Sequence, residues 1–232
     1  MRHVLVTGAN RGLGFELTRQ CLAGGDHVYA GCRHPEQAAA LSSLATVYEG
    51  RLTMLTLDVT NEETIDASQE IVSSQTNALG LLFNNAATHP GAETITTLSA
   101  ETLIHTLRVN AVGPMLITQR YLDLLKAASS PKIINISSEA GSISKMQHFR
   151  GYAYYASKAA LNMLTRALAW DESLAGVIVI AIHPGWMRTD MGGDRAPLSP
   201  AQSAAGILRV VDGLAAASSG RFYTYEGHEH PW

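Results

Sequence analysis

Cysteine is scarce in this chain of 232 residues, which contains two, Cys21 and Cys32. Two cysteines cannot build a disulfide framework, and their spacing matches no metal-binding motif. We therefore expect both to be small buried side chains in a protein of a reducing compartment. His228 and His230 lie two residues apart without a partner cluster, so we predict no metal.

The sequence also lacks an excess of charge of either sign and any long apolar run. Its formal net charge is -3, and charged residues make up 16% of the chain. A net charge of this size gives no general attraction to nucleic acid or an anionic membrane, and no apolar run reaches the roughly 20 residues that span a bilayer. The first expected strand begins almost at once, which leaves no room for a signal peptide. These features predict a cytoplasmic protein without nucleic-acid or membrane partners.

Short apolar runs rich in β-branched residues alternate with helical patterns along the whole chain. We expect strands at residues 3–7, 27–32, 52–57, 79–84, 132–137, 177–183 and 221–223. We expect helices at residues 12–23, 36–48, 62–75, 99–127, 153–174 and 200–217. Continuous rather than alternating apolar runs are typical of parallel strands covered on both faces. The pattern predicts one α/β domain over residues 1–232, a doubly wound Rossmann fold whose mostly parallel seven-stranded sheet lies between two helical layers.

A glycine-rich turn follows the first expected strand and leads directly into a helix. Gly8 would allow the sharp turn, Gly12 would remove a Cβ from the path of a pyrophosphate, and Gly14 would let helix and strand pack closely. Helix N-termini favour such anions. The spacing G-x-x-x-G-x-G differs from the commoner dinucleotide fingerprint, so a plain strand-helix turn is the alternative interpretation.

The end of the second expected strand indicates which nicotinamide cofactor would bind. An acidic residue there is typical of folds that prefer NAD, and this chain has Arg33 instead. Arg33, together with Arg11 in the glycine turn, could hold a 2′-phosphate through charge-assisted bonds. We therefore predict NADP(H). Two solvated surface arginines, and an enzyme that uses NAD, are the alternatives.

A tyrosine and a lysine lie one helical turn apart at the start of the 153–174 helix. The ammonium of Lys158 would stabilise the tyrosinate form of Tyr154 and lower its pKa, which suits general acid chemistry. Such pairs are common in helices and alone carry little weight. Ser138, at the carboxyl end of a central strand, would reach the same edge of the sheet, so hydroxyl and phenol could converge on one carbonyl oxygen.

Taken together, these motifs resemble the short-chain dehydrogenase/reductase family, and within it the C-factor-like branch that includes NADPH-dependent carbonyl reductases. The order and spacing match over essentially the whole chain. The residues that carry the resemblance are Thr7–Gly14, Asn84-Asn85-Ala86, Asn110, Ser138, Tyr154, Lys158, Pro184-Gly185 with the segment through Met191, Gly220-Arg221-Phe222 and Pro231-Trp232.

The resemblance implies a role for each of four catalytic residues. Tyr154 would deliver a proton to the carbonyl oxygen, and Ser138 would hydrogen-bond that oxygen. Lys158 would bind the nicotinamide ribose and lower the Tyr154 pKa. Asn110 would hold a water that links Lys158 to solvent. The hydride would come from the cofactor.

The resemblance also implies the cofactor contacts. Asp58 would meet the adenine, Asn84 and Ala86 would pass beside the adenosine ribose, and Thr189 would bind the carboxamide. The full set of expected NADP(H) contacts is Gly8, Asn10, Arg11, Gly12, Leu13, Arg33, Asp58, Val59, Asn84, Ala86, Tyr154, Lys158, Pro184, Gly185, Met187 and Thr189.

Three features depart from the usual pattern of the family. Ala87 replaces the glycine that usually ends the Asn-Asn-Ala-Gly motif, which puts a methyl near the cofactor's path. The spacing from Ser138 to Tyr154 is slightly long, so a loop at residues 141–151 carries a small insertion that would shape the substrate mouth. That loop holds Met146, His148, Phe149 and Arg150. The segment 186–198 is short, which predicts a small lid and an open pocket.

Two classes of function remain open at this point. The first is an NADP(H)-dependent oxidoreductase acting on a small carbonyl or alcohol substrate, in either direction. The second is a non-catalytic NADP-binding regulator or signalling protein that retains the fold. The complete catalytic set favours the enzyme. The family pairs through its long helices, so we expect a homodimer or homotetramer.

Overall fold

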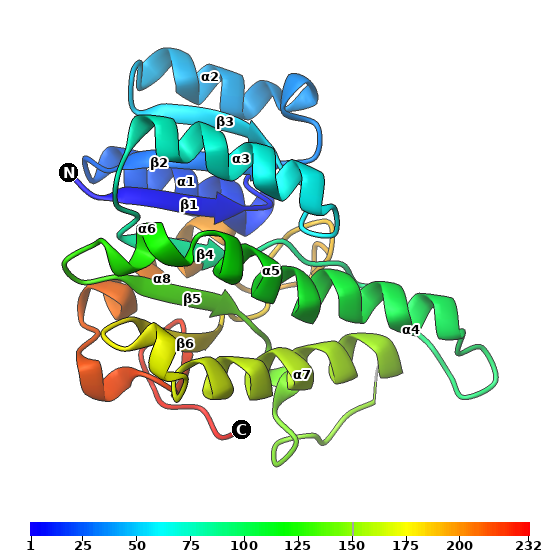
Figure 1. The fold of residues 1–232 in the computed structure, drawn as a ribbon. Helices are drawn as coiled ribbons and strands as arrows, with labels where there is room; N and C mark the ends of the chain where they lie inside the picture. The colour runs from blue at the N-terminus through cyan, green and yellow to red at the C-terminus, as the bar shows by residue number, and fades with distance from the viewer. Residues whose placement is uncertain (150) are drawn as a thin grey trace.

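The computed structural model describes residues 1–149 and 151–232, and a seven-stranded parallel sheet forms its centre (Figure 1). The strand order is β3-β2-β1-β4-β5-β6-β7, and every strand pairs in parallel with its neighbours. The strands are β1 His3–Thr7, β2 His27–Cys32, β3 Leu52–Thr56, β4 Leu81–Asn84, β5 Lys132–Ile136, β6 Ile178–His183 and β7 Phe222–Thr224.

The direction in which the sheet is built reverses between β1 and β4. Strands β1 to β3 add outward on one side, and β4 to β7 add outward on the other. The register across the reversal pairs Val4 with Leu81 and Val6 with Phe83. In open α/β sheets the crevice outside the carboxyl ends of the strands at such a point is where ligands bind.

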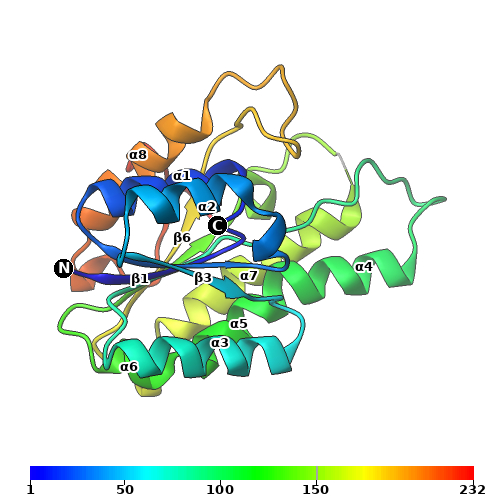
Figure 2. The same ribbon diagram turned by 90° about the horizontal axis from the view of Figure 1, so that it is seen from above.

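Helices cover both faces of the sheet, as the view from above shows (Figure 2). One layer contains α1 Gly12–Ala23, α2 Ala39–Val47 and α8 Pro200–Asp212. The other contains α3 Glu62–Gln75, α4 Ala100–Leu107, α5 Gly113–Arg120, α6 Leu122–Lys126 and α7 Tyr152–Leu168. This arrangement confirms the predicted doubly wound architecture.

The two layers enclose two apolar cores, because successive strand residues point to opposite faces. In β1, Val4 and Val6 pack under α1 and α8, whereas Leu5 packs under α3 and α5 with Tyr29 and Tyr121. All of these side chains are fully buried. The double coverage is why the strands are hydrophobic without alternation. Cys21 and Cys32 are free and buried, as expected.

Strand bounds agree with the prediction to within two residues, but three long predicted helices were wrong in length. The 99–127 helix is interrupted by a π-helical turn at Arg108–Val112 and divided further at Tyr121. Pro114 has no N–H to donate and its ring crowds the preceding turn, which explains the wider turn. The 153–174 helix ends at Leu168, and Asp171 caps a separate 3₁₀ turn by accepting a bond from the Ser173 N–H.

The predicted 200–217 and 36–48 helices also ran too long, whereas the predicted 12–23 and 62–75 helices agree with α1 and α3. The 200–217 helix ends at Asp212, where Gly213 follows, and residues 216–218 form a 3₁₀ turn. The 36–48 helix is a 3₁₀ turn at Pro35–Gln37 followed by α2. Within the described ranges, no helix is long and apolar enough to cross a bilayer.

Candidate active site

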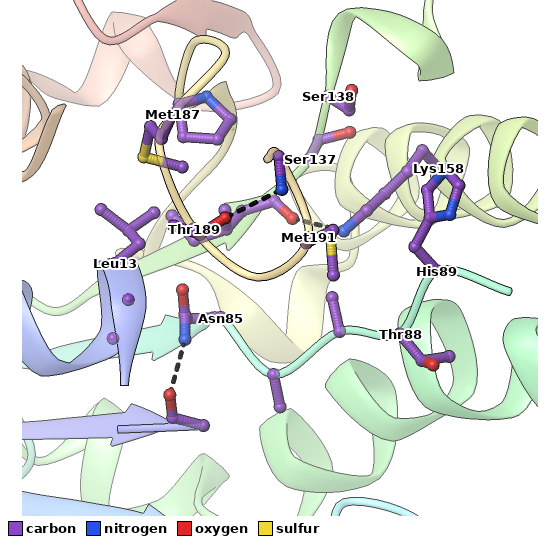
Figure 3. Close-up of a pocket in the computed structure, with 18 of the residues that line it drawn as sticks. Leu13, Asn85, Thr88, His89, Ser137, Ser138, Lys158, Met187, Thr189 and Met191 are labelled. Atoms are coloured by element: carbon purple, nitrogen blue, oxygen red, sulfur yellow. Dashed lines mark hydrogen bonds between the residues drawn. The ribbon is translucent and has the colours of Figure 1, made fainter. Parts of the chain in front are cut away.

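A large cleft of about 1220 Å³ opens at the carboxyl ends of the strands, where the strand order reverses between β1 and β4. The glycine turn after β1 forms one wall, and the loops after β4, β5 and β6 form the rest. Lys158 enters it from α7, His89 lies close by on the loop after β4, and Thr189 and Met191 face them from the loop after β6 (Figure 3).

The glycine turn has the geometry that close approach of a ligand requires. Gly8 and Gly12 have positive φ angles of 66° and 55°, which favour glycine. A Cβ on Gly14 would lie 2.2 Å from the Gly8 carbonyl oxygen, so only glycine fits there. The Asn85 amide donates to the Thr7 and Gly8 carbonyl oxygens at 2.8 and 3.1 Å, which ties the turn to the loop after β4.

Asp58 lines the cleft near the charges of two arginines. Burial acts to raise the pKa of this carboxyl, but its pKa is lowered overall. The hydroxyl and backbone N–H of Thr60 donate to it at 2.7 and 2.8 Å, and Arg33 and Arg108 lie near enough to stabilise the anion. Arg33 therefore lines the cleft beside an ionised carboxylate.

Arg11 extends from the glycine turn across the mouth of the cleft. Its guanidinium donates to the Asp190 carboxylate at 2.5 Å, and both side chains are largely exposed, at 70% and 75%. This ion pair joins the turn after β1 to the loop after β6. Surface pairs of this kind contribute little energy, so a phosphate could replace Asp190 as the partner of Arg11.

Tyr154 lies in the first turn of α7, with its phenol buried beside Ser138. Burial raises the pKa of Tyr154 to about 12, and a hydrogen bond with Ser138 acts in the opposite direction. The Ser138 oxygen also accepts from the Ala140 N–H at 3.1 Å. The Ser138 hydroxyl and the Tyr154 phenol therefore lie together at the cleft.

Lys158 is 2% exposed and projects from α7 toward the floor of the cleft. Its Nζ donates to the Ile136 carbonyl oxygen at 2.8 Å and lies 5.7 Å from the centre of the Tyr154 ring. Burial lowers the pKa of Lys158 to about 7. The predicted lowering of the Tyr154 pKa was wrong for this geometry, because burial disfavours the charged form of both groups.

Asn110 lies within the π-helical turn and is completely buried. Its Oδ1 accepts from the Thr88 N–H at 2.8 Å, and its Nδ2 donates to the Thr88 carbonyl oxygen and the Ser157 hydroxyl at 2.9 and 3.0 Å. The side chain therefore fastens the loop after β4 to α7.

The structure brings most of the predicted site residues together along this one cleft. Those in its lining are Gly8, Asn10, Arg11, Gly12, Leu13, Arg33, Asp58, Val59, Ala86, Ser138, Tyr154, Lys158, Pro184, Gly185, Met187 and Thr189. Asn84 and Asn110 lie beneath it. The Asn84 amide donates to the Asn135 side-chain oxygen at 2.9 Å, and so braces β4 against β5. Ala87 lines the cleft in place of the usual glycine.

Two loops line the part of the cleft where the substrate was expected. The loop before α7 is tied down where Tyr155 donates to the His148 carbonyl oxygen at 2.9 Å. Arg150 of that loop, which was expected at the mouth, lies outside the described residues. In the loop after β6, Met187 bridges to Leu198, and the Trp186 indole donates to the Gly192 carbonyl oxygen at 2.8 Å.

Sequence reasoning missed two residues of the loop after β4. The ring of His89 lies 4.6 Å from the ring of Tyr154, and the Glu93 carboxylate accepts from the Ala153 N–H at 2.8 Å. No motif or periodicity marks either residue. In the part of the chain that the structure describes, no group of three or more His, Cys, Asp or Glu residues could hold a metal ion.

Comparison with known proteins identifies a family model and a relative that match this chain. The family model described as short chain dehydrogenase matches residues 2–198. The C-signal protein of Myxococcus xanthus is 36% identical over 157 residues, which cover 68% of this chain and 95% of that protein.

Solved structures of carbonyl reductases have the same fold. The NADPH-bound carbonyl reductase from chicken fatty liver superposes with a TM-score of 0.94 at 35% identity, covering 100% of this chain and 99% of that one. The carbonyl reductase Sniffer of D. melanogaster superposes with a TM-score of 0.93 at 34% identity, and the match covers 100% of both chains.

Proposed function

This chain belongs to the short-chain dehydrogenase family, and we propose that it is an NADP(H)-dependent oxidoreductase that interconverts a carbonyl compound and its alcohol. The observation that carries this proposal is the meeting of Ser138, Tyr154 and Lys158 in a single large cleft. The similarity to carbonyl reductases, one of them with NADPH bound, supports the same reaction class.

The residues that line the cleft fit a phosphorylated dinucleotide. Gly8 and Gly12 carry no Cβ that would crowd a pyrophosphate at this turn, and the N-terminus of α1 faces it. Arg11 and Arg33 supply two cations for a 2′-phosphate. Asp58 would meet the adenine and Thr189 the nicotinamide carboxamide. When bound, NADPH supplies the hydride that the side chains of this protein cannot.

Tyr154 would act as the general acid in the direction of reduction. Its raised pKa keeps the phenol protonated near pH 7, so it can deliver a proton to the developing alkoxide. Ser138 would donate a hydrogen bond to the same oxygen, because its own oxygen is already fixed by the Ala140 N–H. In the direction of oxidation, the two residues take the reverse roles.

Lys158 would return a proton to the site after each turnover. Its pKa of about 7 lets the amine gain and lose a proton near neutral pH. The bond to the Ile136 carbonyl oxygen holds the amine between the sheet and Tyr154. Asn110 supports this arrangement by binding Thr88 and Ser157, the latter on the same helix as Lys158.

The substrate side of the cleft favours an apolar carbonyl compound. Met146, Trp186 and Met191 line it and are about half exposed, so a ligand could cover apolar surface there. We further propose one domain over residues 1–232 that acts in the cytoplasm as a homodimer or homotetramer. Ile104 of α4 and Met163 of α7 are 64% and 68% exposed, which leaves apolar surface for pairing.

A titration with NADPH and NADH, followed by an activity screen, tests this proposal. The purified protein is titrated with each cofactor by fluorescence and then assayed at saturating NADPH with a panel of aldehydes, ketones and quinones. Tight NADPH binding and turnover that Tyr154→Phe abolishes are the expected results. Tight binding without turnover over the whole panel would favour the non-catalytic regulator, and absence of binding would overturn the cofactor assignment.

A further inference from the structure

The helix that carries Tyr154 and Lys158 does not cap its own N-terminus. Its N-cap residue, Gly151, has no side chain, whereas Asn61, Ser99 and Ser199 cap α3, α4 and α8 with their own side-chain oxygens. A free first turn leaves backbone N–H groups without partners inside the protein. The start of α7 therefore needs an acceptor from another part of the chain.

Glu93 supplies that acceptor from the loop after β4. Its Oε2 accepts from the Ala153 N–H at 2.8 Å, although the two residues are 60 positions apart, and Glu93 is only 8% exposed. A Cβ on Gly151 would lie 3.2 Å from the same oxygen, so the glycine lets the carboxylate come close. A negative charge at a helix N-terminus is also favoured by the helix dipole.

His89, four residues earlier in the same loop, contacts Tyr154 directly. The two ring centres are 4.6 Å apart with the ring planes at 44°. The His89 ring is fixed in turn, because its Nδ1 accepts from the Gly91 N–H at 2.9 Å. Lys158 Nζ lies 5.7 Å from the centre of the Tyr154 ring, so His89 and Lys158 both border the phenol.

The segment at residues 88–93, which we call the 88–93 arm, is anchored at its base as well. Both backbone groups of Thr88 are bonded to the Asn110 side chain, at 2.8 and 2.9 Å. The arm thus runs from a buried anchor, past the Tyr154 ring, to the first turn of α7. In Figure 3 Thr88 and His89 follow one another along this segment toward Lys158.

We propose that His89 and Glu93 are positioning residues that hold Tyr154 in its reactive orientation. Glu93 acts through the first turn of α7, and His89 acts through the phenol ring. Displacement of a reacting group by about 1 Å can cost about 100-fold in rate, so two weak supports can have a large kinetic effect. The inference rests on the proposed oxidoreductase function, because it assigns the arm to the proton-transfer step.

Four variants, in two matched pairs, test the proposal on the full chain. Glu93→Ala removes the cap, and Glu93→Gln keeps an acceptor oxygen at the same reach. His89→Ala removes the ring, and His89→Phe keeps a ring of similar size. Each variant is assayed for kcat, KM and NADPH Kd with one carbonyl substrate of the wild type, and thermal unfolding checks that it is folded.

The alanine variants should lose about 10- to 100-fold in kcat with unchanged KM and NADPH Kd, and the conservative variants should recover most of that loss. A purely structural role would not separate kcat from binding in this way. Wild-type kcat in both alanine variants would overturn the proposal, as would equal losses in the alanine and conservative variants. If Glu93→Ala does not fold, Glu93→Asp, whose shorter side chain weakens the cap, takes its place.

Hydrogen exchange separates failure of this inference from failure of the proposed function. Glu93→Ala should speed exchange of the amides at the start of α7, while Glu93→Gln should not. If the wild type turns over no carbonyl but this difference is seen, the oxidoreductase proposal fails and the cap stands. If the wild type is active and exchange at the start of α7 is the same in all variants, the arm does not hold the helix.

Discussion

Arg11 and Asp190 form an ion pair that joins the glycine turn after β1 to the loop after β6 across the mouth of the cleft. Arg11 is also one of the two arginines assigned to the cofactor's 2′-phosphate. The carboxylate and the phosphate would therefore compete for the same guanidinium. The competition must be mild, because exposed ion pairs contribute only about 0.2–1 kcal/mol.

Asp190→Asn should strengthen NADPH binding by up to about fivefold, because it frees Arg11 at the cost of a weak surface pair. NADH lacks the 2′-phosphate, and its Kd should not change. Fluorescence titration with both cofactors at low and high salt measures this, and the gain should shrink as salt screens the charges. An equal change in both Kd values would show that Asp190 acts on the shape of the loop instead.

Arg33→Ala should weaken NADPH binding by about 10- to 100-fold and leave NADH binding nearly unchanged, because a charge-assisted hydrogen bond contributes about 1.5–3 kcal/mol. Isothermal titration with each cofactor gives the two ratios. Arg120→Ala is the matched control, because Arg120 of α5 pairs with Asp66 of α3 away from the cleft lining. This variant should bind both cofactors as the wild type does. Comparable losses for both cofactors in the Arg33 variant would contradict the 2′-phosphate assignment.

Tyr154→Phe should reduce kcat by at least about 100-fold, because general acid catalysis contributes about 100- to 10,000-fold. Its NADPH Kd should remain close to that of the wild type. Tyr152→Phe is the matched control, since Tyr152 lies on the same helix but its side chain packs against Phe149 outside the cleft. Steady-state kinetics on both variants would reject the assignment if Tyr154→Phe kept substantial activity.

Lys158 should make the cofactor-free protein more stable as pH rises from about 7 to about 9. Burial lowers its pKa from 10.5 to about 7, so in this window the unfolded chain binds a proton that the folded protein does not. The unfolding free energy should then gain at most about 1.4 kcal/mol per pH unit. Above pH 9 the buried thiol of Cys21, whose pKa is raised to about 12, acts in the opposite direction.

Urea unfolding of the wild type and Lys158→Met across that window checks this dependence. The variant should lose the rise with pH, because it has no amine to titrate. Lys126→Met removes a lysine from the exposed surface and should keep the wild-type slope. If the unfolding free energy of Lys158→Met rose with pH as steeply as that of the wild type, Lys158 would not be the neutral buried amine that causes the rise.

Gly14→Ala should destabilise the protein by about 1–3 kcal/mol, because the new Cβ would overlap the Gly8 carbonyl oxygen at 2.2 Å and the backbone must shift. The shift would also disturb the pyrophosphate turn and weaken NADPH binding. Gly24→Ala, at the other end of α1, meets its nearest atoms at 3.4 Å and serves as control. Chemical unfolding and cofactor titration should show a lower unfolding free energy and a higher NADPH Kd for Gly14→Ala, and unchanged values for Gly24→Ala.

The sheet could be predicted from the sequence because its strands are buried on both faces. The central strands β1, β4, β5 and β6 are mostly apolar and almost fully buried, and the turn after β1 is marked by Gly8. Helix lengths were predicted less well. The 99–127 segment was expected to form one helix, and the effect of Pro114 on the backbone depends on how α5 packs against its neighbours.

The members of the site could be predicted, but their mutual contacts could not. Motif spacing placed Tyr154, Lys158 and Ser138 at one edge of the sheet. It did not show that Lys158 turns toward the Ile136 carbonyl oxygen, nor that burial would raise the Tyr154 pKa. The contact of Glu93 with the Ala153 N–H joins residues 60 positions apart, and no local pattern encodes it.

The place of β1 in the sheet has a consequence for the order in which the newly made chain can fold. β1 pairs with β2 on one edge, but its other edge pairs with β4, which is translated roughly 70 residues later. At about 5–20 residues per second, that edge stays uncovered for several seconds. An unpaired strand edge is a template for association with other chains. Until β4 has been made, the newly made N-terminal segment therefore exposes one edge of β1 to association with other chains.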